Sequence, residues 1–266
     1  MEGVHFRRDF ATFREIGTKC MIANISDIAA MGGFPTRAVV SLCIPAHITE
    51  NDISAIYDGL LDACRRFSFD IVGGDIVSAP RDLVISITLM GAARRDRVVT
   101  RSGAVVGDAI MITGRIGGAE AGLRALTEGL PREGDVLKAV RRHLRPIPRI
   151  AEAQAFLDVA TPHAMIDISD GLGSELWHLA DESRVGVRIE LSRIPIDESA
   201  VTLAEKVGCS AYELAMGSGE EFELIVAIPP SEMSRTAEHV AAMTGTTATY
   251  IGDVVDATEG CSLMKA

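Results

Sequence analysis

The sequence predicts a mixed α/β protein built from two compact units. Its 266 residues exceed the roughly 150 typical of one domain, and 47 % of them are apolar, enough for sizeable cores. Apolar residues recur at helical spacing in some segments and as short runs or alternations in others, typical of helices mixed with strands. A boundary near Gly103 divides the chain into residues 1–103 and 104–266.

The first unit begins with a helix and continues with strands and a second helix. Thr12 and Glu15 form a capping-box pattern, so a helix is expected from there to Met31, where Gly32 and Gly33 end it. Further expected elements are a strand at 37–44, a helix from Thr49, a short strand at 70–72, a strand at 83–90 and an edge strand at 97–101.

The second unit alternates strands and helices in the same way. Expected strands cover 108–113, 164–168, 185–189, 222–228, 247–251 and the region of Ser262. Expected helices cover 119–126, 132–145, 198–207, 231–243 and a segment after Gly171. The single tryptophan, Trp177, is predicted to lie in the core, and Arg141, Arg142 and Arg145 on a solvated helix face.

Charge and motif content exclude several classes of function. Twenty-six basic against 37 acidic residues give a net charge of −11, which argues against nucleic acid as a partner. No run of 18 apolar residues and no apolar core after the N-terminal charges exist, so neither a membrane span nor a signal peptide is expected. Five cysteines without C-x-x-C fit reduced thiols in the cytoplasm. Zinc-hydrolase, P-loop and nucleophile-elbow motifs are absent.

Two acidic positions in the first unit are candidates for ligand binding. Asp27 falls in a helix that is apolar around most of its circumference, so we expect it to be buried and to need a partner. That partner is either a salt bridge or backbone amide, or a metal or ligand. Gly73-Gly74-Asp75 follows an apolar strand, which is compatible with an ordinary turn or with close approach of a ligand.

Two further acidic segments lie in the second unit. In Ile166-Asp-Ile-Ser-Asp-Gly171, strand alternation places Asp167 and Ser169 on one face, and Asp170 is either a helix N-cap or a ligand. The three glutamates of Gly217-Ser-Gly-Glu-Glu-Phe-Glu223 open an apolar strand and form either a solvated face or a positioned carboxylate. Together the four segments suggest carboxylates that hold divalent cations, which in turn hold phosphates.

Several motifs, taken in order, resemble the thiamine-monophosphate kinase family of the aminoimidazole-ribonucleotide synthetase superfamily. The resemblance is carried by Glu2-Gly-Val-His-Phe6, Asn24-Ile-Ser-Asp-Ile-Ala-Ala-Met-Gly-Gly33, Gly73-Gly-Asp75, Arg101-Ser-Gly-Ala, Thr113-Gly-x-Ile-Gly, Ile166-Asp-Ile-Ser-Asp-Gly-Leu172 and Gly219-Glu-Glu-Phe-Glu-Leu224. It implies a two-domain α/β fold with a dimer-forming, nucleotide-binding domain at 1–103 and an α/β domain at 104–266. The implied assembly is a homodimer with ATP and Mg²⁺ near the interface.

The resemblance also implies roles for particular residues. It assigns Mg²⁺ to Asp27, Asp75, Asp167 and Asp170, ATP to Tyr57, Gly74, Arg101 and Ser169, and thiamine monophosphate to His5 and Glu220. The family's Gly-x-Gly-Asp-Asp-Ala segment, its Thr-Asp pair and its C-terminal aromatic contact have no counterpart in this sequence, and Glu221 stands where the family has Asp.

The implied reaction transfers a phosphoryl group from ATP to thiamine monophosphate. The acceptor is a phosphate oxygen ionised near neutrality, with a second pKa of about 6, so no general base and no catalytic side chain is required. Direct in-line transfer, aided by Mg²⁺ and Arg101, is expected. The alternatives are another ATP-using enzyme of the superfamily, of the aminoimidazole-ribonucleotide synthetase or hydrogenase-maturation type, or a non-catalytic nucleotide-binding dimer module.

Overall fold

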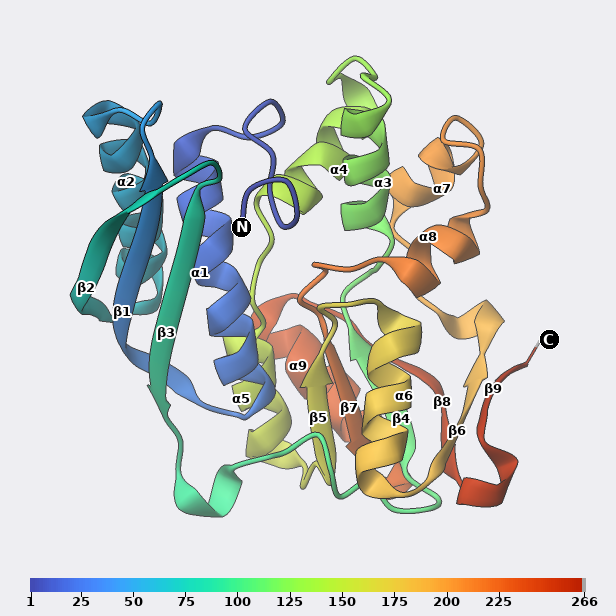
Figure 1. Ribbon diagram of the computed structural model, residues 1–266. Coiled ribbons are helices and arrows are strands. Elements are labelled where there is room, and N and C mark those ends of the chain that lie inside the picture. The colour runs from blue at the N-terminus through green and yellow to red at the C-terminus, as the bar shows by residue number, and fades with distance from the viewer. Residues whose placement is uncertain (265–266) are drawn as a thin grey trace.

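The computed structural model describes residues 1–264, which form two sheets with helices packed against them (Figure 1). The N-terminal sheet has the order β2-β1-β3, with β1 parallel to β2 and antiparallel to β3. Its strands and helices are α1 (Phe13–Ala30), β1 (Phe34–Pro45), α2 (Glu50–Phe67), β2 (Asp70–Ala79) and β3 (Val84–Ala92). The two helices lie on the same side of this sheet, as Figure 1 shows. The core between the helices and the sheet includes Ile25, Leu42 and Leu60.

The packing of α1 against α2 depends on two glycines. A Cβ atom added to Gly17 would lie 2.1 Å from the backbone oxygen of Ile56, and one added to Gly59 would lie 1.9 Å from that of Arg14. The hydroxyl of Thr18 donates to the backbone oxygen of Gly59 at 3.1 Å. The two helix backbones are therefore in direct contact, which fixes α1 relative to the N-terminal sheet.

The C-terminal sheet is larger and has the strand order β5-β7-β4-β8-β6-β9. Neighbouring strands are antiparallel except β6 and β9. The strands are β4 (Ala109–Thr113), β5 (Ala164–Asp167), β6 (Gly186–Glu190), β7 (Leu224–Ile228), β8 (Ala248–Val255) and β9 (Cys261–Met264). The helices are α3 (Gly118–Thr127), α4 (Gly134–Leu144), α5 (Ile150–Val159), α6 (Leu172–Ser183), α7 (Glu198–Ala204), α8 (Ala211–Gly217) and α9 (Met233–Thr244).

Both faces of this sheet are buried, and alternating residues of the central strands pack into a core on each face. Ile110 and Ile112 of β4 pack in one core with the leucines of α6, whereas Met111 packs in another core with Phe156 of α5 and Val240 of α9. A separate apolar core joins α3, α4, α7 and α8, which lie together at one end of the sheet (Figure 1). Loops connecting this helical group to the sheet carry much of the candidate site.

The two halves meet along α1. Ile150 at the start of α5 belongs to the N-terminal core, and Ala30 at the end of α1 belongs to the core of α5 and α9. The amide of Gln154 donates to the backbone oxygen of Gly32 at 2.9 Å. Helix α1 is therefore the element that brings N-terminal side chains to the edge strand β5 of the larger sheet.

Most expected elements are confirmed, and the differences have local causes. The capping box of Thr12 and Glu15 starts α1, while β2 runs to Ala79 rather than ending at residue 72. No strand forms at 97–101, because a 3₁₀ turn at Arg95–Arg97 leads into Val99, whose side chain enters the core of α5 and α9. Helices α5 and α8 were not expected.

Trp177 does not lie in the core: it is 57 % exposed. It follows Leu176 on α6, and a step of one residue turns the side chain about 100° around a helix, away from the sheet. No helix within residues 1–264 is both long and apolar enough to cross a membrane.

The glycine contact between α1 and α2 predicts a large effect of one added methyl group. We expect Gly59→Ala to lower the free energy of unfolding by about 1–3 kcal/mol, because the new Cβ must displace the backbone of Arg14. Urea unfolding followed by circular dichroism measures this. Gly217→Ala is the control, since its Cβ meets no atom within 4 Å. Equal stability of the two variants would contradict the assigned contact.

Candidate active site

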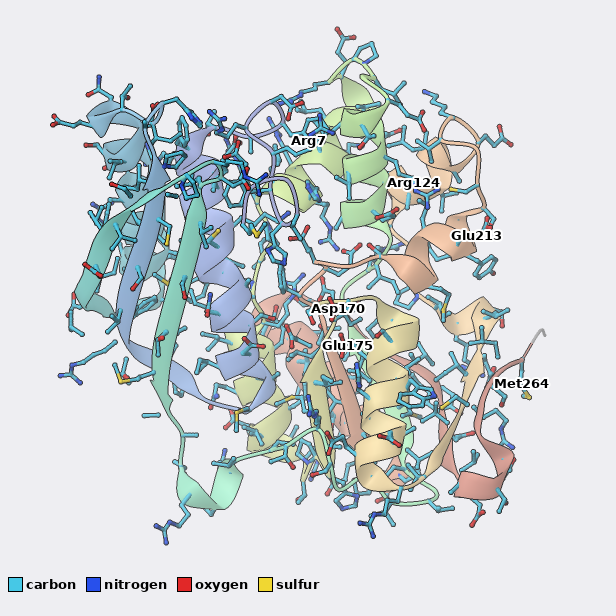
Figure 2. The ribbon with its side chains drawn as sticks, in the orientation of Figure 1. Arg7, Arg124, Asp170, Glu175, Glu213 and Met264 are labelled. Carbon is cyan, nitrogen blue, oxygen red and sulfur yellow. The ribbon has the colours of Figure 1, made fainter. Side chains whose placement is uncertain are left out.

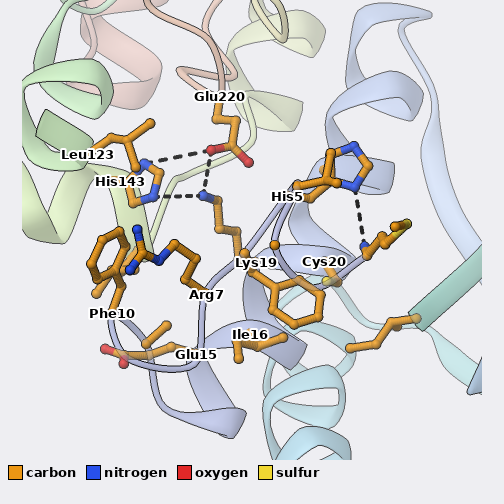
Figure 3. Close-up of a pocket in the computed structure, with 18 of the residues that line it drawn as sticks. His5, Arg7, Phe10, Glu15, Ile16, Lys19, Cys20, Leu123, His143 and Glu220 are labelled. Atoms are coloured by element: carbon orange, nitrogen blue, oxygen red, sulfur yellow. Dashed lines mark hydrogen bonds and ion pairs between the residues drawn. The ribbon is translucent and has the colours of Figure 1, made fainter. Parts of the chain in front are cut away.

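A cavity of about 310 Å³ lies between the N-terminal segment, α1, α4 and the loop at 217–223 (Figure 3). Its walls are partly apolar and include Phe6, Phe10 and Ile16. Its polar groups come from four separate segments and include His5, Arg7, Lys19, His143 and Glu220. The structure thus brings His5 and Glu220, which are 215 positions apart in the sequence, to one cavity.

Three of the polar groups contact one another on one side of the cavity. The Lys19 ammonium donates to Oε2 of Glu220 at 2.6 Å and lies 3.3 Å from Nε2 of His143 (Figure 3). Nδ1 of His143 is 3.7 Å from the same Glu220 oxygen. Burial, together with the nearby charge of Lys19, lowers the pKa of His143 to about 3. His143 is therefore neutral near pH 7, and its Nε2 accepts a hydrogen bond from the Lys19 ammonium.

The loop that carries Glu220 is held in an unusual conformation. Glu220 and Phe222 have φ angles of +59° and +55°, in the left-handed region that costs a non-glycine residue about 1–2 kcal/mol. The backbone N–H groups of both residues donate to β5–α6 loop carbonyls, those of Ser169 and Ile168 respectively. The loop is thereby tied to the segment that carries Asp167 and Asp170.

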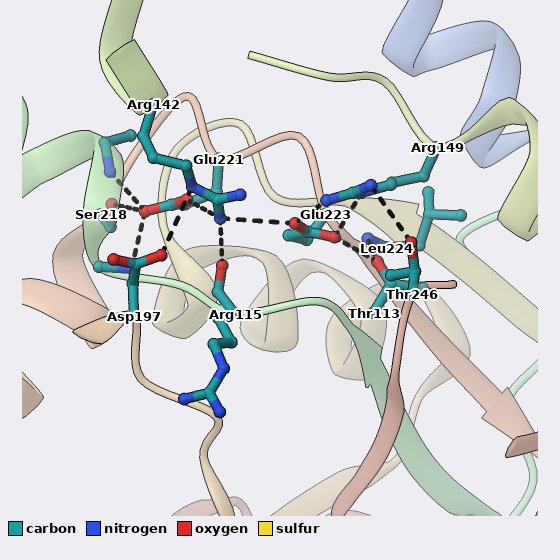
Figure 4. Close-up of polar contacts among 12 residues, drawn as sticks. Thr113, Arg115, Arg142, Arg149, Asp197, Ser218, Glu221, Glu223, Leu224 and Thr246 are labelled. Atoms are coloured by element: carbon teal, nitrogen blue, oxygen red, sulfur yellow. Dashed lines mark hydrogen bonds and ion pairs between the residues drawn. The ribbon is translucent and has the colours of Figure 1, made fainter. Parts of the chain in front are cut away.

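Glu221, the next residue, is buried and binds the start of α3. Its Oε1 accepts from the backbone N–H groups of Gly117 and Ala119 at 2.7 and 2.9 Å, and from Ser218 at 2.6 Å (Figure 4). Burial raises its pKa, whereas the Arg142 guanidinium, 3.3 Å from Oε2, lowers it. A carboxylate at a helix N-terminus is favourable because the first N–H groups lack partners within the helix.

Glu223 anchors the far end of the loop through a buried ion pair. Its two oxygens accept from Nη2 and Nε of Arg149 at 2.5 and 2.7 Å, and Thr113 donates to Oε2 at 2.7 Å (Figure 4). Glu223 has no exposed surface. The expectation of a wholly solvated Arg142 is wrong, because its guanidinium lies 3.5 Å from Glu223 as well as contacting Glu221.

A second group of carboxylates lies where α1 meets the end of β5. Asp167 is the last residue of β5 and is buried, and the hydroxyl of Ser26 donates to its Oδ2 at 2.5 Å. Burial, reinforced by the carboxylates of Asp27 and Glu175, raises the pKa of Asp167 to about 6 against the lowering effect of Ser26. Asp167 has no Lys or Arg ion-pair partner within residues 1–264.

Asp27 lies beside this group but is not buried as expected. Its side chain is on the exposed edge of α1, although Ser26 and Ala29 around it are buried. Partial enclosure by the protein and then the charge of Glu175 raise its pKa. The expectation failed because the pattern counts Ala23 and Ile28 as apolar, whereas both are only half-buried and lie with Asp27 on the open edge of the helix.

Glu175, on the first turn of α6, orients the loop after β5 (Figure 2). Its Oε1 accepts from the hydroxyl of Ser169 and from the backbone N–H of Asp170, both at 3.1 Å, and its side chain is buried. Asp170 is exposed and is not the N-cap of α6, because Gly171, with a φ of +110°, takes that position. The carboxylate of Asp170 has no hydrogen-bond or ion-pair partner within residues 1–264 and can therefore bind a ligand.

The remaining residues assigned by resemblance lie away from this group. Gly74 and Asp75 are exposed on β2, and Tyr57 is half-buried on α2. The guanidinium of Arg101 pairs at 2.7 Å with Glu182, seven residues or about 10 Å along α6 from Glu175. Within residues 1–264 the structure joins Asp27, Asp167, Ser169 and Asp170 at one place and His5 with Glu220 at another, and it leaves Tyr57, Gly74, Asp75 and Arg101 apart.

The carboxylate group fits a hard divalent cation bound jointly with phosphates. No three His, Cys, Asp or Glu side chains among residues 1–264 form a ready metal cage. Mg²⁺, however, keeps several waters and is commonly bound by one or two carboxylates plus substrate phosphates. The carboxylates of Asp27, Asp167 and Glu175 supply oxygen ligands for such a cation. Their uncompensated negative charge would be neutralised by it.

Comparison with known proteins places the chain in a class. Residues 1–93 match the family model of AIR synthase related protein, N-terminal domain, and residues 105–262 match that of AIR synthase related protein, C-terminal domain. These matches, together with the two-sheet architecture, define an AIR synthase-related protein.

More specific relatives are kinases. A thiamine-monophosphate kinase of Rhodopirellula baltica is 37 % identical to this chain, over 87 % of this chain and 67 % of the relative. A thiamine-monophosphate kinase of Bacillus subtilis is 34 % identical, over 100 % of this chain and 81 % of the relative. The solved structure of AaThiL complexed with AMPPCP and TMP is 31 % identical with a TM-score of 0.88, over 100 % of this chain and 82 % of that one. The chain belongs to the thiamine-monophosphate kinase family and is an enzyme of the kinase class.

Three residues of the site were missed by sequence reasoning. Lys19 lies on a helix that is apolar around most of its circumference, and His143 lies on an amphipathic helix; in each case a polar residue on a buried side is the only signal. Glu175 falls at the fourth position of α6, where an acidic residue fits the helix N-terminus and needs no other explanation. Only the fold reveals what each of them contacts.

The buried neutral His143 predicts an acid-sensitive stability. Its pKa rises from about 3 when folded to the ordinary 6.5 when unfolded, so the unfolded chain gains a proton as the pH falls below 6.5. Between pH 7 and 5 we expect wild type to lose about 2 kcal/mol more of its unfolding free energy than His143→Gln.

Urea unfolding at both pH values measures this difference. His178→Gln, a change at an exposed histidine of α6, is the matched control and should follow wild type. Parallel pH dependence of wild type and His143→Gln would show that His143 is not held neutral.

Proposed function

We propose that this protein transfers the γ-phosphoryl group of ATP to thiamine monophosphate, forming thiamine diphosphate, with Mg²⁺. One observation carries the proposal: a single helix, α1, links two sites. One is the partly apolar cavity that contains His5 and Glu220, and the other is the uncompensated group of carboxylates that contains Asp167. The first suits a ring-bearing acceptor and the second suits metal-bound phosphates. Relatives at 34–37 % identity with that activity support the proposal.

The acceptor would lie in the cavity with its phosphate directed toward β5. Apolar side chains such as Phe6 and Ile16 can pack against its rings, and His5 and Glu220 provide polar contacts. Glu220 offers a carboxylate oxygen, a suitable partner for the amino group or the positive charge of the thiamine ring system.

The metal and the nucleotide would be held by the carboxylate group. Asp27, Asp167 and Asp170 are the proposed ligands from this end of α1 and β5, and Ser169 is the proposed contact to ATP. When bound, Mg²⁺ neutralises the charge of the two polyanions. The ordered Ser26–Asp167 and Glu175–Ser169 hydrogen bonds set the positions of these groups before substrates arrive.

We propose direct in-line transfer, with no residue acting as nucleophile or base. The acceptor oxygen is already ionised near neutral pH, so positioning and charge neutralisation are the remaining requirements. The one buried histidine of the cavity, His143, is neutral and bonded to Lys19, which does not suit it to hold a phosphoryl group. A labelled phosphoprotein that reacts onward at the rate of turnover would contradict this mechanism.

The activity is tested by incubating the protein with ATP, Mg²⁺ and thiamine monophosphate and quantifying thiamine diphosphate by fluorescence after oxidation. Wild type should form product. Asp167→Asn should be slower by about 100-fold or more, because losing a metal carboxylate costs about 3 kcal/mol of transition-state stabilisation.

The matched control is Asp181→Asn, a change at an exposed aspartate of α6 that should leave the rate unchanged. A folded wild-type protein that binds ATP yet forms no thiamine diphosphate would contradict the proposed reaction. Such a result would favour a nucleotide-binding module or another activity of the superfamily.

We also propose a homodimer formed by residues 1–103, with β2 pairing against its copy. Strand β2 is an edge of its sheet, and exposed apolar residues gather there, including Val72, Ile76 and Val77. A bare apolar edge strand is prone to pair with another strand. In this proposal Asp75 on β2 would contribute to the metal at the interface, and Gly74, Tyr57 and Arg101 would contact the nucleotide. The cytoplasm is the proposed compartment, since all five cysteines are free.

Light scattering after size exclusion tests the dimer. Wild type should have about twice the chain mass of 28.3 kDa, and Ile76→Asp should shift it toward one chain mass by placing a charge in the paired edge. Met243→Asp, at an exposed apolar residue of α9, is the control and should stay dimeric. A wild type of one chain mass at micromolar concentration would contradict the proposal.

A further inference from the structure

Lys19 is a buried cation whose position has no structural explanation in α1 alone. It is 7 % exposed, on a helix face that otherwise buries Ile16 and Ile22, and lysine is rarely buried without a partner. Its partner is not a neighbour on the helix but Glu220, 201 positions away in the sequence. The ion pair therefore joins the N-terminal half of the chain to the loop at 217–223 inside the cavity.

The ion pair determines which way Glu220 points. Because Glu220 has a left-handed backbone on a tightly anchored loop, its carboxylate can reach only a limited part of the cavity. Oε2 accepts from Lys19 at 2.6 Å, whereas Oε1 has no hydrogen-bond partner within residues 1–264. One oxygen is thus fixed and the other remains available to a ligand in the cavity.

His143 supports this arrangement from α4. Its Nε2 lies 3.3 Å from the Lys19 ammonium, and the neutral ring accepts a hydrogen bond without adding a charge that would compete for Glu220. Lys19 is therefore held between an anion and a neutral acceptor, and its ammonium cannot turn away without losing both contacts (Figure 3).

We infer that Lys19 is a positioning residue for the acceptor substrate: it orients Glu220 so that the free carboxylate oxygen binds an amino-bearing or cationic ring in the cavity. This inference rests on the proposed function and adds a residue to it. Its consequence is that Lys19 governs acceptor binding and leaves nucleotide binding, at the other end of α1, unaffected.

A double-mutant cycle tests the inference without relying on turnover. Lys19→Met, Glu220→Ala and the double variant are titrated calorimetrically with thiamine monophosphate and, separately, with AMPPCP and Mg²⁺. Each single change should weaken thiamine monophosphate binding by about 10- to 100-fold, as expected for loss of a charged hydrogen bond, and change AMPPCP binding less than about 2-fold. The double variant should bind no more weakly than Glu220→Ala.

The controls separate positioning from folding and from general charge. Lys138→Met removes an exposed lysine that pairs with Asp135 on α4 and should bind both ligands as wild type does. Lys19→Gln retains an N–H donor toward Glu220 and should recover part of the affinity lost in Lys19→Met. If Lys19→Met does not fold, the thiamine monophosphate affinities of Lys19→Gln and wild type are compared instead. Thermal unfolding shows whether each variant is folded.

The possible results have distinct meanings. If the losses of thiamine monophosphate affinity caused by Lys19→Met and Glu220→Ala multiply in the double variant, the inference is overturned, because Lys19 then acts independently of Glu220. Wild-type affinity in Lys19→Met would also overturn it, while leaving the proposed function intact. A wild type that binds AMPPCP but not thiamine monophosphate would overturn both.

Discussion

The bidentate ion pair between Arg149 and Glu223 is the interaction on which the candidate site depends. It joins the start of α5 to the entry of β7, deep in the protein, and Thr113 of β4 completes the coordination of Glu223. Removing one member of such a buried pair typically costs about 3–5 kcal/mol, because the other charge is left without compensation. Since Glu220 is only three residues away, the same pair also fixes the loop that closes the cavity.

Each of the three glutamates in this loop has a different partner. Glu220 contacts Lys19 from α1, Glu221 binds the first N–H groups of α3, and Glu223 pairs with Arg149. These contacts stabilise two left-handed non-glycine residues that would otherwise be strained. The loop is consequently a rigid connection between the cavity and the β5–α6 turn, which it reaches through backbone hydrogen bonds.

Local patterns predicted the elements and many of the polar positions, but not their contacts. The position of Asp167 within an apolar segment correctly indicated a carboxylate that needs an explanation, and its raised pKa reflects that environment. Asp27 was expected to be buried and is exposed, because periodicity counts apolar residues and does not show which helix edge a neighbouring element leaves open. The pairing of Lys19 with Glu220 depends on how two halves of the chain dock, which no window of sequence contains.

Helix α1 sets a fixed length between the two parts of the site. Lys19 borders the cavity and Asp27 borders the carboxylates, and eight residues of α-helix separate them by about 12 Å. Because Gly17 and Gly59 bring the backbones of α1 and α2 into contact, α1 has a defined position against α2 and the N-terminal sheet. Under the proposed function, an acceptor must therefore span this distance between its ring system and its phosphate.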